Sequence, residues 1–92
     1  MKDEHPELSL EEGMLNTLGL RLSFDSIRKE QGIQVLLLAL HIYPKSANLY
    51  DSLAESYFYN KDYENAIFNF KKSLELNPQN QNAIDRLKQL KE

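Results

Sequence analysis

The chain has 92 residues, of which 41% are hydrophobic, and this length and composition predict one small domain with a core of its own. Its 14 Asp and Glu outnumber its 11 Lys and Arg, and no basic cluster forms a stripe, so nucleic acid is not expected as a partner. The sequence contains no cysteine, which excludes disulfides and thiolate chemistry.

Residues 1–8 are polar, and we expect them to form a disordered or extended tail. They lack the apolar core of a signal peptide, and no apolar run approaches the roughly 18 residues of a membrane span. The sequence therefore predicts a soluble chain without membrane contact, cytoplasmic by default and exported only if it is excised from a secreted parent. A helix is predicted to begin at Ser9, which forms a capping box with Glu12.

Residues 9–46 are predicted to form a first helical hairpin. The apolar positions of its two helices are Leu15, Leu18, Leu22, Leu36 and Ala39. The connecting loop is expected near residues 23–26, and Pro44 marks the end of the second helix, because proline disfavours helix in the residue before it. Gly32 lies inside that second helix, where it lowers helix propensity by roughly 1 kcal/mol but permits close approach of two backbones.

Residues 47–80 are predicted to form a second hairpin. Its apolar positions follow the 3.6-residue period of two amphipathic helices, with Tyr50, Leu53, Ala54 and Tyr57 in the first and Tyr63, Ala66, Ile67, Phe70 and Leu74 in the second. Between them, Asn60 is expected to take the left-handed conformation that ends a helix, and Asp62 to cap the next one. So short a loop predicts antiparallel helices.

The helix boundaries repeat along the chain. Pro44 and Pro78 are 34 residues apart, and each is followed two residues later by a good N-cap, Ser46 or Asn80. A fifth helix is predicted from Asn80 to Leu90. Self-similarity at this period is typical of stacked helical hairpins, which cannot bury their apolar faces alone.

The second hairpin resembles a tetratricopeptide repeat. The residues in matching places are Tyr50, Leu53, Ala54, Tyr57, Ala66, Phe70, Ser73 and Pro78. The resemblance implies an all-α fold of antiparallel helical hairpins stacked as a short solenoid. It implies five helices in two repeats and a cap: a degenerate first repeat at 9–46, a well-formed one at 47–80, and a capping helix at 81–92. It also implies a non-catalytic scaffold for protein–protein interaction.

A narrower resemblance concerns three segments, at residues 15–19, 43–53 and 72–78. They are similar to repeats appended to the C-terminal end of some bacterial serine hydrolases, including esterase-like and β-lactamase-like enzymes. This likeness implies an alternative function, a structural or oligomerisation accessory module of such a hydrolase. It supplies no active site.

The tetratricopeptide resemblance also implies a peptide groove lined by the first helix of each hairpin. The implied groove residues are Asn48, Asp51, Ser52, Glu55, Phe58 and Tyr59, with Asn82, Asp85 and Gln89 from the last helix and Asn16, Leu20 and Ser23 from the first repeat. One branch of the family grips acidic C-terminal tails with Lys and Asn at such positions. Here Asp51 and Glu55 would repel such tails, so a basic or neutral peptide is predicted. The alternative is that so short a groove holds nothing specific.

The segment from Ile33 to Ile42 carries more apolar residues than one stripe of a surface helix needs. One interpretation is burial between the first and third helices. The other is an interface on the second helix, with Ile33, Leu37 and Leu40 as its residues and a homodimer or an upstream hydrolase domain as its partner.

No catalytic constellation is found in the sequence. It contains neither a Gly-x-Ser-x-Gly motif nor a strand pattern on which a nucleophile elbow could form. His5 and His41 are its only histidines, and Asp51 and Glu55 fit a plain polar helix face better than an acid–base pair or a weak metal site. No enzyme activity, cofactor or metal is therefore expected.

Overall fold

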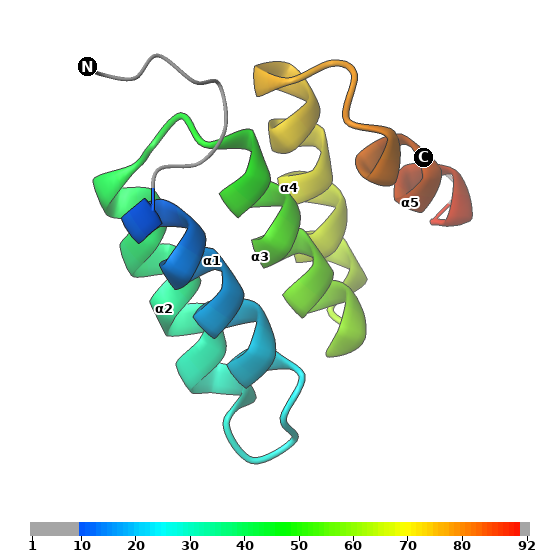
Figure 1. Cartoon of the computed structure of the whole chain (residues 1–92). Helices are drawn as coiled ribbons and strands as arrows, with labels where there is room; N and C mark the ends of the chain where they lie inside the picture. Colours follow the sequence, from blue (N-terminus) through cyan, green and yellow to red (C-terminus); the bar gives the residue numbers. More distant parts are fainter. Residues whose placement is uncertain (1–9, 91–92) are drawn as a thin grey trace, which may run out of the picture.

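The computed structural model describes residues 10–90, which form five α-helices and no strand (Figure 1). The helices are α1 (Leu10–Ser23), α2 (Lys29–Ile42), α3 (Ala47–Tyr59), α4 (Tyr63–Leu76) and α5 (Gln81–Gln89). The predicted all-α class with stacked hairpins is confirmed. The expectations for the tail at 1–8, for His5, for the cap at Ser9 and for residues 91–92 lie outside the described residues.

Three of the predicted N-caps are confirmed. Ser46 Oγ accepts the backbone N–H of Leu49 at 3.1 Å, and Asp62 Oδ1 accepts that of Asn65 at 3.3 Å. Asn80 Oδ1 accepts the N–H of Ala83 at 3.4 Å. Each cap supplies a partner to a backbone donor that the first helical turn leaves unpaired, which fixes where α3, α4 and α5 begin.

The turn between α3 and α4 differs from the expectation by one residue. Asn60 has a φ of −88°, and its N–H still bonds to the Ser56 carbonyl at 3.1 Å, so the last helical turn includes it. Lys61 instead takes the left-handed conformation, with a φ of 65°. The N–H groups of Lys61 and Asp62 bond to the carbonyls of Phe58 and Tyr57, a pairing that satisfies the end of α3 and places the left-handed residue just after the cap.

Two buried clusters form the core. The first joins α2 to α3 and consists of Leu36, Ala39, Leu40, Leu49 and Leu53. The second joins the second hairpin to α5 and consists of Ala54, Ala66, Phe70 and Ala83. Tyr57 packs against both clusters. Leu40, predicted to be an interface residue, belongs to the first cluster and exposes 9% of its surface, so α3 already covers it.

In the first hairpin, α1 and α2 approach each other at two glycines. A Cβ built on Gly32 would lie 2.6 Å from the Gly19 carbonyl oxygen and 2.7 Å from Ser23 Cα, both of which are backbone atoms. A Cβ on Gly19 would instead meet the Leu36 side chain at 2.5 Å. Gly32 is therefore required by the contact between the two helices, which explains its departure from the Ala of the second hairpin.

Candidate protein-binding surface

The face that carries most of the predicted groove residues is formed by α1, α3 and α5. It is called the α1–α3–α5 face below. Polar contacts join α3 to α1 on one side, through Asn16, and to α5 on the other, through Asn82 and Arg86. These contacts decide which predicted residues remain available to a ligand.

The α3–α5 contact is centred on one carboxylate. Glu55 Oε2 accepts from Arg86 Nε at 2.8 Å and Glu55 Oε1 accepts from Arg86 Nη2 at 3.0 Å, a two-point ion pair. The Glu55 side chain is 14% exposed and that of Arg86 is 22% exposed. Asn82 Nδ2 donates to Glu55 Oε2 at 2.8 Å as well. The negative charge predicted at Glu55 is thus paired within the molecule.

Arg86 is held by further contacts besides Glu55. Its guanidinium carbon lies 4.3 Å from the centre of the Phe58 ring, a cation–π geometry, and its Nη1 donates to Gln89 Oε1 at 3.0 Å. The hydrogen bonds to Glu55 raise the pKa of Arg86 against the opposing effect of burial. Phe58 and Gln89, both predicted to line the groove, are therefore partners of Arg86.

Asp51 has amide partners instead of a cation. Its Oδ1 accepts from Asn82 Nδ2 at 2.9 Å. Burial raises the pKa of the Asp51 carboxyl above its usual value of 3.8, the hydrogen bond from Asn82 opposes that shift, and the charge of Glu55 adds to it. Asp51 thus keeps an ionisable group whose charge is screened only in part by its surroundings.

A buried polar cluster joins α1 to α3. Ser52 Oγ donates to Asn16 Oδ1, and Ser56 Oγ lies 2.7 Å from Ser23 Oγ. Ser23 Oγ in turn donates to the Leu20 carbonyl at 2.9 Å. Ser23, Ser52 and Ser56 are each at most 5% exposed. Three residues predicted to line the groove (Asn16, Ser23 and Ser52) are therefore used in helix contact.

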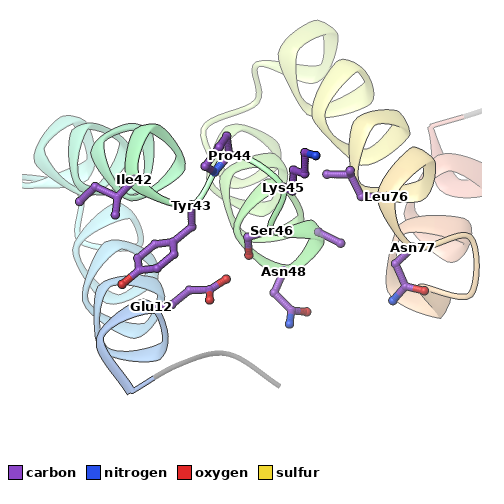
Figure 2. A pocket seen from close by; sticks show the side chains of 10 residues that line it. Glu12, Ile42, Tyr43, Pro44, Lys45, Ser46, Asn48, Leu76 and Asn77 are labelled. Atoms are coloured by element: carbon purple, nitrogen blue, oxygen red, sulfur yellow. The ribbon is translucent and has the colours of Figure 1, made fainter. Parts of the chain in front are cut away.

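At the beginning of α3, the face opens into a hollow of about 720 Å³. Its lining residues are Glu12, Ile42, Tyr43, Pro44, Lys45, Ser46, Ala47, Asn48, Leu76 and Asn77. Figure 2 shows the side chains of Glu12, Asn48 and Asn77 directed to the same side of the hollow, from α1, α3 and the loop after α4. Asn48 is exposed, so a predicted groove residue is accessible at this end.

At the end of α3, a smaller hollow of about 480 Å³ is lined in part by Ser23, Phe24 and Tyr59. Tyr59 is 56% exposed, and its ring centre lies 4.5 Å from that of Phe24. Asp85 is exposed on α5 and accepts from Gln81 Nε2 at 2.9 Å. The accessible groove residues thus lie at the two ends of α3 and along α5.

Arg86 also belongs to this face, although it is not among the predicted groove residues. It stands 34 residues after Ser52, so the same repeat spacing that identifies Asn82, Asp85 and Gln89 also identifies Arg86 as a groove position. Its ion pair with Glu55 spans 31 residues of sequence. The 34-residue period therefore predicts the position of Arg86 on this face. Its pairing with Glu55 depends on how α5 packs against α3.

The predicted interface on α2 divides between core and surface. Leu40 is in the core, Ile33 packs against the first core cluster, and Leu37 is 42% exposed. Two neighbours that were not proposed as interface residues, Leu38 and Ile42, are 56% and 48% exposed. The accessible apolar residues of α2 are therefore Leu37, Leu38 and Ile42.

Two searches of the described residues concern other kinds of site. Within residues 10–90, no three His, Asp or Glu side chains converge to form a candidate metal site. In the same part of the chain, no helix has both the length and the apolar content needed to cross a lipid bilayer.

Comparison with known proteins finds one family model that matches part of this chain. The model of the tetratricopeptide repeat family matches residues 47–80, the range of the predicted well-formed repeat, which comprises α3, α4 and the loop up to the N-cap of α5. Neither a curated protein nor a solved structure shows a significant match to the chain. The match supports the predicted resemblance to a tetratricopeptide repeat, and the all-α fold is consistent with a small helical repeat of this type.

Proposed function

With a tetratricopeptide repeat at residues 47–80 as the premise, we propose that the chain is a non-catalytic interaction module. It binds a neutral or basic peptide segment of another protein along the α1–α3–α5 face. The observation that carries this proposal is the set of accessible polar side chains at the two ends of α3 and on α5, which surround a central region closed by the molecule's own contacts.

The charge of this face favours a neutral or basic ligand. Arg86 is paired with Glu55, whereas Asp51 and Asp85 have amide partners, Asn82 and Gln81. The net charge of these groups is therefore negative. An acidic peptide tail would meet the carboxylates of Asp51 and Asp85, while the charge of Arg86 is already paired with Glu55, and this opposes its binding.

The hollow at the beginning of α3 suits the backbone of an extended peptide. Asn48 and Asn77 each carry an amide that both donates and accepts hydrogen bonds, and they point to the same side (Figure 2). Leu76 and Ile42 form an apolar part of the lining of this hollow. Tyr59, at the other end of α3, offers an exposed ring for an apolar or cationic side chain of the ligand.

The test uses two peptide libraries of equal length, one rich in Lys and Asn and one rich in Asp and Glu with a free C-terminal carboxylate. Binding is measured by ¹H–¹⁵N correlation spectra of the whole chain, which also locate the contact. We expect the neutral and basic peptides to shift amides of α3 and α5. Replacing Asp51→Ala together with Asp85→Ala should weaken their binding about threefold to tenfold, through loss of charge complementarity.

Glu64→Gln is the matched control, because Glu64 is an exposed acid in the first turn of α4 and is absent from the groove positions. It should leave the affinity unchanged. Tight binding of an acidic C-terminal peptide that survives Asp51→Ala would refute the proposed use of this face, as would shifts confined to α2.

A second candidate function is supported by the outer surface of α2. Leu37, Leu38 and Ile42 are exposed apolar residues on one helix, which suits packing against a partner domain such as a bacterial serine hydrolase. Hydrogen–deuterium exchange of the chain mixed with a hydrolase domain encoded beside it would test this. Protection of α2 that Leu38→Lys abolishes favours the accessory function, whereas protection of α3 and α5 favours the peptide-binding function.

A further inference from the structure

The two hairpins differ at one pair of equivalent positions on their first helices. Met14 and Leu18 of α1 stand 35 residues before Leu49 and Leu53 of α3. In α3, these leucines are 0% and 3% exposed, because they pack into the first core cluster against α2. In α1, Met14 is 63% exposed and Leu18 is 46% exposed. Leu49 and Leu53 thus form a ridge by which α3 stacks on the preceding hairpin, and the equivalent ridge on α1, formed by Met14 and Leu18, is exposed.

The flanks of this open ridge carry opposite charges. Glu11, Met14, Leu18 and Arg21 are spaced by three, four and three residues, which places them along one side of α1. All four are exposed. The Tyr43 hydroxyl donates to Glu11 Oε1 at 3.0 Å, which orients the carboxylate at the N-terminal end of the ridge. This set is called the α1 ridge below.

The α1 ridge is complementary to itself. Its charged ends and its apolar centre are symmetric about the middle of the helix. If a second α1 is laid antiparallel on the first, Met14 meets Leu18 of the second copy, and Glu11 meets Arg21 of the second copy. The same contacts recur at the other end, as a two-fold axis requires.

Head-to-tail stacking of copies is disfavoured by the rest of the fold. The surface of α2 on which the equivalent ridge of α3 packs is already covered by α3 within the same chain. At the other end, α5 covers the second hairpin through Ala83, and within the described residues it exposes no large apolar side chain. Within residues 10–90, the stacking surfaces that α3 and α5 use are therefore occupied, which favours pairing of two like α1 ridges.

We propose that two copies of the chain associate through the α1 ridge, with the two α1 helices antiparallel across a two-fold axis. This goes beyond the proposed peptide-binding function, and it uses a different set of residues from the α1–α3–α5 face. One pair of 14-residue helices buries a small area, so the dimer should be weak, with a dissociation constant on the order of 10 to 100 μM.

Sedimentation velocity of the full chain from about 1 μM to 1 mM tests the proposal. We expect a reversible monomer–dimer equilibrium. Leu18→Lys places an ammonium group in the apolar centre and should weaken the dimer at least about tenfold. Phe68→Lys is the matched control, since Phe68 is a 64% exposed apolar residue on α4, and this variant should dimerise like the unchanged chain.

The charge pairs test the antiparallel arrangement. Arg21→Glu places two carboxylates against each other at each end and should weaken the dimer about threefold to tenfold. Adding Glu11→Arg to Arg21→Glu should restore the affinity, because the opposite charges are exchanged. Far-ultraviolet circular dichroism should be the same for all variants, since the substituted residues are exposed.

Several results would overturn the proposal. A chain that stays monomeric over the whole concentration range would do so. A dimer that Leu18→Lys leaves intact while Leu37→Lys disrupts it would place the contact on α2 instead of α1. A double charge variant that is no tighter than Arg21→Glu alone would exclude the antiparallel pairing.

Discussion

Ionisation of the Asp51 carboxyl is less favourable in the folded chain than in the unfolded chain, because its hydrogen bond offsets the effect of burial only in part. Its pKa is raised by burial and by the nearby charge of Glu55, against the hydrogen bond from Asn82. A carboxyl whose pKa is higher in the folded than in the unfolded chain opposes folding when it is ionised. That unfavourable contribution is absent below the unfolded value near 3.8, and it develops as the pH rises through the folded value.

We therefore expect Asp51→Asn to stabilise the chain at pH 7, because it keeps an acceptor for Asn82 and removes the charge. The difference in melting temperature between the variant and the unchanged chain should decrease as the pH is lowered toward 3.8. Thermal unfolding followed by circular dichroism at several pH values measures this. Glu64→Gln, an exposed change outside this contact, serves as the control. A loss of stability in Asp51→Asn at pH 7 would contradict the interpretation.

Gly32 is a second residue with a clear energetic role. An added Cβ would meet backbone atoms of Gly19 and Ser23, which cannot relieve the contact by a change of rotamer as a side chain can. We expect Gly32→Ala to lower the free energy of unfolding by about 3 kcal/mol, despite the gain in helix propensity. Gly19→Ala meets the Leu36 side chain and should cost about 1 to 2 kcal/mol. Urea denaturation of both variants tests the order, and equal costs would contradict it.

At the scale of elements, α5 is held to the second hairpin by two different kinds of contact. Ala83 contributes to the second core cluster, and Leu87 and Leu90 pack against it. Arg86 and Asn82 supply the polar contacts to Glu55 and Asp51. Because α5 has only nine residues, it has little helix stability of its own. These tertiary contacts therefore determine whether it forms.

The ion pair between Glu55 and Arg86 should be measurable by a double-mutant cycle. Its two-point geometry and partial burial predict a coupling free energy of about 1 to 2 kcal/mol for Glu55→Gln and Arg86→Gln. Each single variant should also increase amide exchange in α5 more than in α2. The exposed pair Lys72–Glu75, with its two residues three apart on α4, is the comparison and should give below about 0.5 kcal/mol. Similar coupling in the two pairs would count against a special role for Arg86.

Element boundaries could be predicted from sequence because they depend on local chemistry. Ser46, Asp62 and Asn80 each bond to the backbone N–H three residues later, so each cap can be predicted from a short window of sequence. The left-handed residue was assigned to Asn60 instead of Lys61, because one more helical hydrogen bond moves the turn by one position. Composition alone gives no sign of that bond.

Site residues were harder to predict because their state depends on how helices cross. The repeat spacing places Ser52 and Glu55 on the α1–α3–α5 face, yet Ser52 is used against Asn16 and Glu55 against Arg86. Leu40 and Leu37 are both leucines of α2, but Leu40 lies on the side that packs against α3, whereas Leu37 remains exposed. Which side chains pair across a sequence separation of about 30 residues can be known only from the tertiary structure.

For the whole molecule, the order of stacking determines how stability is shared. Contacts link neighbouring elements, α1 with α2, α2 with α3, α3 with α4 and α4 with α5, and α1 also meets α3. Such an arrangement is nearly one-dimensional, so its cooperativity depends on the residues that join one hairpin to the next. The α1–α3 contact contains the polar pairs of Ser52 with Asn16 and of Ser56 with Ser23, and Leu15 of α1 packs against the cluster that α2 and α3 form. The apolar connection therefore passes through α3.

Tyr57 is the residue that connects the two core clusters, since its side chain packs against both. Tyr57→Ala should lower the free energy of unfolding by about 2 kcal/mol and should also separate the unfolding of the first hairpin from that of α4 and α5. Tyr50→Ala is the matched control, because Tyr50 packs against the first cluster alone. It should lower stability but leave one transition.

Amide exchange measured at increasing urea concentration resolves the two cases, residue by residue. In the unchanged chain and in Tyr50→Ala, the slowest amides of α2 and α4 should open together, whereas in Tyr57→Ala they should open at different urea concentrations. Joint opening in Tyr57→Ala would mean that the remaining contacts of α3 with α1 and α2 are enough to keep the two hairpins cooperative.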